Sequence, residues 1–189
     1  VHWIAEGLPN AGQLMFFNNG FDGRGYSTID IIEPPIDAQG NYTLAANGVF
    51  EPDSALWSYV GNPPNSFYSS IISSGQRLPN GNTLICDGAA GRIFEIDTQD
   101  SIVWDYINPV RISGPAAQGT AISGNSIFRA IKYSVDYSGL QGVNLMPTVP
   151  IEINPLPSNC VIYTPTEIVA KTNFSIYPNP FTTQLFIEN

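Results

Sequence analysis

Residues Ser73–Tyr106 read SSGQRLPNGNTLICDGAAGRIFEIDTQDSIVWDY, and this stretch decides the fold that we predict. The apolar run 83–86 and the alternating run 92–97 are each typical of a β-strand with a buried face. Turns rich in Asn, Asp and Gly separate these runs from each other and from a third run at 101–106. With 69–77 in front, the pattern predicts four antiparallel strands in about 40 residues, the size of one β-propeller blade.

An earlier part of the chain repeats this pattern. The segments 13–20, 26–32 and 56–59 match the second, third and fourth predicted strands of the later copy. Both fourth strands carry a Trp-x-Tyr motif followed by Asn-Pro, and the two tryptophans, Trp57 and Trp104, lie 47 residues apart. That distance is within the range of propeller repeats. We therefore expect two blades, with a long insertion at 34–54 in the first and a small hairpin around 42–44 within that insertion.

The rest of the chain divides by composition. Runs at 119–123 and 126–133 predict strands that begin a third unit. Prolines recur between 143 and 170, which indicates a linker of extended or polyproline II backbone. The predicted fold is all-β: a partial β-propeller of four-stranded antiparallel blades (1–142), the Pro-rich linker (143–170) and short C-terminal strands (171–189). Because two blades cannot close a ring, we expect a fragment whose missing blades lie N-terminal.

Composition restricts the classes of partner. Of the 189 residues 43% are hydrophobic and only 12% are charged, with 17 Gly and 16 Pro, which suits short strands joined by many turns. The formal net charge is −9 and the seven basic residues are scattered. Nucleic acid is therefore excluded as a partner, an anionic membrane surface is disfavoured, and no transmembrane segment is expected.

Cysteine and histidine are too few for a disulfide framework or a zinc site. The chain has two cysteines, Cys86 and Cys160, and one histidine. We expect Cys86, which lies in an apolar strand, to pack as a small buried side chain. A bridge between the two cysteines is the less favoured alternative. No metal and no cofactor are expected.

The C-terminal stretch closely resembles the start of a type IX secretion C-terminal sorting domain of Bacteroidetes-type bacteria. The similarity covers FSIYPNPF at 174–181 and the strand-like run 184–188 that follows the Pro-rich segment. It implies the type IX secretion machinery as a partner, and export across the outer membrane to a secreted or cell-surface location. The alternative is an ordinary proline turn between two strands.

Residues 1–142 resemble the arylsulfotransferase-like propeller family. The segments with this likeness are 3–12, FNNG at 17–20, Tyr-Ser at 26–27, RLPNGNTLI at 77–85 and VWDY at 103–106. The resemblance implies sulfuryl transfer from a phenolic sulfate to a phenol, through a histidine surrounded by further His and Arg residues. Thr28 stands where the family often has arginine, and His2 is the only histidine.

The candidate site residues follow from this chemistry. His2 is the candidate catalytic residue because a neutral imidazole can attack a sulfuryl group. Arg77, Arg92 and Arg129 are candidate substrate-binding residues because a guanidinium fork can hold sulfonate oxygens.

Each of these assignments has a structural alternative. His2 would then be a histidine at the rim of a strand, and the arginines would pair with acidic neighbours such as Asp87, Glu95 or Asp97. Trp57 and Trp104 have matched positions, which favours packing over stacking on an aromatic substrate. The alternative function is a non-catalytic secreted propeller that binds a ligand or glycan at the cell surface.

Overall fold

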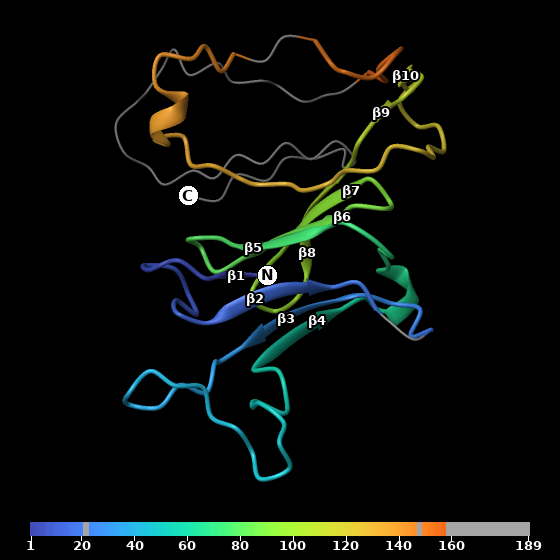
Figure 1. Cartoon of the computed structure of the whole chain (residues 1–189). Helices are drawn as coiled ribbons and strands as arrows, with labels where there is room; N and C mark the ends of the chain where they lie inside the picture. Colours follow the sequence, from blue (N-terminus) through green and yellow to red (C-terminus); the bar gives the residue numbers. More distant parts are fainter. Residues whose placement is uncertain (21–22, 147–148, 158–189) are drawn as a thin grey trace.

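The computed structural model describes residues 1–20, 23–146 and 149–157, and its regular structure consists of antiparallel sheets and two short 3-10 turns (Figure 1). The first sheet has the strand order β1 (His2–Trp3), β2 (Leu14–Asn18), β3 (Thr28–Ile32) and β4 (Trp57–Val60). The second has the order β5 (Ser74–Arg77), β6 (Thr83–Asp87), β7 (Arg92–Ile96) and β8 (Ile102–Ile107). The smaller elements are η1 (Pro64–Ser66), β9 (Val110–Arg111), β10 (Gly114–Pro115) and η2 (Ser138–Leu140). The all-β class and the four-stranded antiparallel sheets are confirmed.

The predicted strands at 119–123 and 126–133 are wrong. Within the described part of the chain, the segment 126–133 lies beside β5 but forms no regular ladder with it. Side chains of β5 bind its backbone instead: Ser74 exchanges hydrogen bonds with Ala130, and Gln76 bonds both the N–H and the carbonyl of Lys132. Because side chains satisfy these backbone groups, the segment is held in place without becoming a strand.

The insertion and the C-terminal regions differ from expectation in detail. The predicted hairpin around 42–44 is replaced by two isolated bridges, Ile36–Tyr42 and Leu44–Phe50. In the described part of the linker, Ile153 forms a single bridge with Ala117. The predicted strands at 171–189 lie outside the described residues. No helix in the described ranges combines the length and the apolar character that a membrane crossing requires.

The two sheets have the same register, strand by strand. Leu14 at the start of β2 pairs with Ile32, as Thr83 at the start of β6 pairs with Ile96. On the outermost strands, Trp57 lies opposite Ile31 and Trp104 lies opposite Glu95. The third strands end at Ile32 and Ile96, so Trp57 and Trp104 occupy equivalent positions in two copies of one unit.

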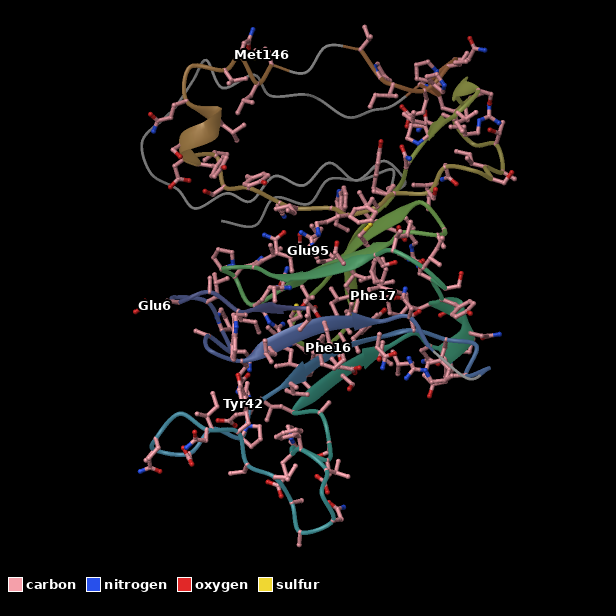
Figure 2. The ribbon with its side chains drawn as sticks, in the orientation of Figure 1. Glu6, Phe16, Phe17, Tyr42, Glu95 and Met146 are labelled. Carbon is pink, nitrogen blue, oxygen red and sulfur yellow. The ribbon has the colours of Figure 1, made fainter. Side chains whose placement is uncertain are left out.

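The sheets pack with unlike faces together. Met15, Phe17, Ile29 and Tyr59 project from one face of the first sheet into the shared core, because alternate residues of a strand share a face. The second sheet contributes Ile85, Phe94 and Ile96 to the same core. The equivalent residues of the first sheet, Phe16, Asp30 and Ile32, lie on the face of that sheet that points away from this core. Figure 2 shows Phe17 on the side of β2 toward the second sheet and Phe16 on the other side. Such head-to-tail packing can be repeated by further sheets.

Aromatic contacts hold the interface together. The ring of Phe67, which precedes β5, lies 5.6 Å from Phe94 and 5.4 Å from Phe17 between ring centroids, both edge to face. Tyr59 lies 5.6 Å from Phe67 and 6.0 Å from Phe94. Pairs of this kind each contribute about 0.5–1.5 kcal/mol beyond the area that they bury. The core is therefore built from both sheets, and neither sheet buries its apolar face alone.

Candidate functional site

His2 lies on the edge strand of the first sheet. In β1 it pairs with Met15, whose side chain enters the core, so His2 projects toward the side of the second sheet. The side chain is exposed. Its pKa is lowered from the ordinary histidine value, chiefly by partial burial and also by the positive charge of Arg129. A lowered pKa keeps the imidazole neutral near pH 7, as a nucleophile requires.

Arg129 is the one predicted arginine whose charge acts on His2 in the described structure. It belongs to the segment 126–133, is exposed, and its charge reaches the His2 imidazole. The ion pair between Lys132 Nζ and Glu95 Oε2, at 2.7 Å, anchors this segment to the second sheet. Two of the four predicted site residues therefore influence each other electrostatically, one on an edge strand and one on the segment beside β5.

Arg77 has a structural role. Its side chain is 8% exposed, and its Nη1 donates to the Gly81 carbonyl at 3.0 Å and to Thr83 Oγ1 at 2.7 Å. The guanidinium carbon lies 4.9 Å from the ring centroid of Trp57, a cation–π contact between the two sheets. The expected pairing with an acidic neighbour is wrong here: among the described residues Arg77 makes no ion pair, and burial lowers its pKa.

Arg92 is bound to an acidic residue, but not to one of those expected. Its Nε and Nη2 donate to the two carboxylate oxygens of Asp105, at 2.9 and 2.6 Å. The guanidinium also lies 4.5 Å from the ring centroid of Phe94. Bonding to Asp105 raises the pKa of Arg92. The bidentate pair fixes the side chain and neutralises its charge, so Arg92 is a weak candidate for binding sulfate.

The paired tryptophans and Cys86 are packing residues. Trp57 is partly buried against the core, and Trp104 stacks on Tyr106 with ring centroids 5.9 Å apart. Cys86 is a free, buried thiol, as expected, and burial together with the charge of Asp87 raises its pKa to about 11. A thiol with so high a pKa is unreactive at neutral pH.

A cleft that we did not predict lies between the outer strands of the two sheets. It has a volume of about 340 Å³, and its polar lining residues are Tyr59, Asn62, Ser66, Arg92 and Asp100. Two of these belong to the segment GNPPNS at 61–66 that joins the sheets. The recurrence of Asn-Pro after each Trp-x-Tyr motif was the sequence signal that marked this junction, but the pattern does not reveal a cleft.

No protein-family model, curated protein or solved structure matches the chain at a significant level. Among the residues that the structure describes, no three or more His, Cys, Asp and Glu side chains are grouped to hold a metal ion.

Proposed function

We propose that the edge formed by β1 and the segment 126–133 binds an aryl sulfate and transfers its sulfuryl group to a phenol. The observation that favours this is that Arg129, whose charge is one of those that lower the pKa of His2, lies on a segment held against β5, which is the first strand of the second sheet as β1 is of the first. It gives one site both a neutral nucleophile and a cation for anionic oxygens, which are the two groups that sulfuryl transfer needs.

The reaction is written in two steps. The neutral imidazole nitrogen of His2 attacks sulfur, the bond from sulfur to the phenolic oxygen breaks, and the phenolate leaves. A phenol acceptor then gives its proton to the released phenolate and attacks the sulfur, and the nitrogen–sulfur bond breaks to regenerate the imidazole. Arg129 balances the negative charge on the sulfuryl oxygens throughout.

The setting that we propose is an exported propeller. The head-to-tail packing of two sheets in one register supports the propeller hypothesis, because each blade of a propeller presents unlike faces to its two neighbours. The segment 126–133 lies against the outward face of the second sheet, where the next blade would begin. The likeness of 174–188 to a sorting domain supports export by the type IX machinery.

The test is an assay of transfer from 4-nitrophenyl sulfate to phenol, with His2→Ala and Arg129→Ala. We expect His2→Ala to abolish turnover and Arg129→Ala to weaken binding of the donor by about five-fold or more. Arg111→Ala, in strand β9, is the matched control and should leave turnover unchanged.

The pH profile gives an independent readout. Turnover should fall as the pH drops through the lowered pKa of His2, because the protonated imidazole has no lone pair for attack. Arg129→Ala removes one cause of that lowering, so the acid limb of the profile should move to higher pH. Turnover by His2→Ala equal to the wild type would overturn the proposal.

The second candidate is a propeller that binds a ligand without transfer. It is favoured because the side chains of Arg77 and Arg92 are hydrogen-bonded within the fold. Of the predicted arginines, Arg129 is then the one whose charge acts on His2. Binding of 4-nitrophenyl sulfate without release of 4-nitrophenol, and lost in Arg129→Ala, would favour this function over catalysis.

A further inference from the structure

The cleft lies at the opposite edge of the sheets from His2. β1 and β5 are first in their sheets and β4 and β8 are last, and the cleft is lined by Tyr59 and Val60 of β4 and by Ile102 of β8. Its volume of about 340 Å³ falls within the range of pockets that hold small molecules. Its use is independent of the proposed transfer reaction, because it shares no residue with the His2 site.

The polar groups of the cleft include both donors and acceptors. Tyr59 is 7% exposed and lines the cleft together with Asp100 and with Arg92, which Asp105 holds in place. Burial raises the pKa of Tyr59, which keeps its hydroxyl protonated as a donor. Asn62 and Ser66 are exposed on the loop at one side and supply an amide and a hydroxyl.

The charges of the cleft select against an anion. The guanidinium of Arg92 is neutralised by its bidentate bond to Asp105, and Asp100 adds a carboxylate, hydrogen-bonded to Trp57, at the exposed β7–β8 turn. The Nη1 of Arg92 makes no hydrogen bond in the described structure, and it is held in place by the pair with Asp105 and by Phe94 beneath it. A fixed donor, a carboxylate acceptor, an amide and hydroxyls suit a ligand with several neutral hydroxyl groups.

The loop beneath the cleft is closely packed. A Cβ on Gly61 would lie 2.6 Å from Ser66 Oγ and 2.8 Å from the Cβ of Phe67. Glycine alone fits there, so the chain at Gly61 packs closely against Ser66 and Phe67, two residues that line the cleft with Tyr59. From this geometry we propose that the cleft between β4 and β8 binds an uncharged sugar residue through Tyr59, Asn62, Ser66, Arg92 and Asp100.

The test is an NMR titration of the intact chain with the methyl glycosides of glucose, galactose and mannose. We expect saturable shifts of cleft resonances with at least one of them, with a Kd of about 1 mM or below. Tyr59→Phe removes one hydrogen bond while keeping the ring, and should weaken binding about five-fold. Tyr68→Phe, an exposed tyrosine that does not line the cleft, is the matched control and should bind as the wild type does.

Two further variants make the result decisive. Asn62→Ala changes an exposed side chain of the loop and should weaken binding even if Tyr59→Phe proves unstable. His2→Ala should leave sugar binding unchanged, so failure of the transfer proposal and failure of this one are distinguishable. No saturable shift with any of the three glycosides, or equal affinity in wild type, Tyr59→Phe and Asn62→Ala, would overturn the proposal.

Discussion

Asp87 occupies in the second sheet the position that Asn18 occupies in the first. Each is the last residue of the second strand, and each pairs with the first residue of the third strand, Arg92 or Thr28. The Asn18 amide donates to Asp30 at 3.3 Å. Asp87 is 3% exposed, and its Oδ1 has no hydrogen-bond partner. The side chain at this position of the repeated unit is therefore hydrogen-bonded in the first sheet, whereas in the second sheet one carboxylate oxygen is buried without a hydrogen bond.

The first prediction is that Asp87→Asn stabilises the fold. Burial raises the pKa of Asp87, opposed by the Ala90 backbone, the charge of Arg92 and a hydrogen bond from Ser69. The folded state thus disfavours the charged carboxylate, and the penalty grows as the pH rises from the unfolded pKa through the folded one. We expect Asp87→Asn to equal the wild type at low pH and to exceed it by about 1 kcal/mol at pH 7. Urea unfolding across this pH range measures the difference.

The reciprocal exchange is the control for this prediction. Asn18→Asp places a carboxylate beside that of Asp30, which already accepts bonds from Thr28 and Ser58. Two adjacent carboxylates repel when ionised, so this variant should lose stability above the carboxyl pKa range. A wild type more stable than Asp87→Asn at pH 7 would contradict our description of the site.

A second prediction concerns the approach of the two sheets. Gly75 of β5 lies against the first sheet: a Cβ there would be 3.2 Å from Ile29 Cδ1 and 3.4 Å from Met15 Sδ. Gly75→Val should therefore destabilise the chain by about 1–3 kcal/mol, through overpacking of the shared core. Gly75→Ala should lose less, since only one methyl group must be accommodated. Thermal unfolding that is unchanged in both variants would show that the sheets do not pack in this way.

A third prediction links the anchor of the segment 126–133 to the proposed site. Glu95 has a side chain 1% exposed, bound by Lys132 and by the Asn82 amide, each at 2.7 Å. Lys132→Met removes the cation. We expect the free energy of local opening of the segment to fall by about 1–2 kcal/mol, a modest change because Lys132 is partly exposed. Hydrogen exchange at the Ile127 amide, which bonds the Gly88 carbonyl, reports this opening.

The same variant should also weaken aryl sulfate binding, because Arg129 lies on the loosened segment. Lys132→Arg keeps the charge and should restore most of the protection. Equal exchange rates at Ile127 in the wild type and Lys132→Met would show that the ion pair between Lys132 and Glu95 does not hold the segment in place.

The fold was predictable where local pattern and turn chemistry agree. The alternation at 92–97 and the turns around it specify β6, β7 and β8 without knowledge of any partner, and the repeated Trp-x-Tyr specifies the equivalence of β4 and β8. The run 126–133 has the same apolar character. It is not a strand, because Ser74 and Gln76 of a distant segment bind its backbone, and a local pattern does not contain that contact.

The candidate site was predictable only in part. Residue type nominated the arginines as anion-binding candidates, but whether their side chains are available for a ligand depends on three-dimensional partners. Arg77 is bound by Gly81 and Thr83, and Arg92 by Asp105 on the neighbouring strand. The electrostatic influence of Arg129 on His2, 127 positions away by number, depends on how the sheets and the segment 126–133 pack, which sequence spacing does not encode.

The central claim is that His2 accepts a sulfuryl group, and mass spectrometry of the chain after incubation with 4-nitrophenyl sulfate tests it most directly. Without a phenol acceptor, we predict a covalent sulfuryl adduct located at His2, lost on addition of phenol and absent in His2→Ala. An unmodified His2 in a chain that binds the aryl sulfate would contradict the claim and leave a binding protein.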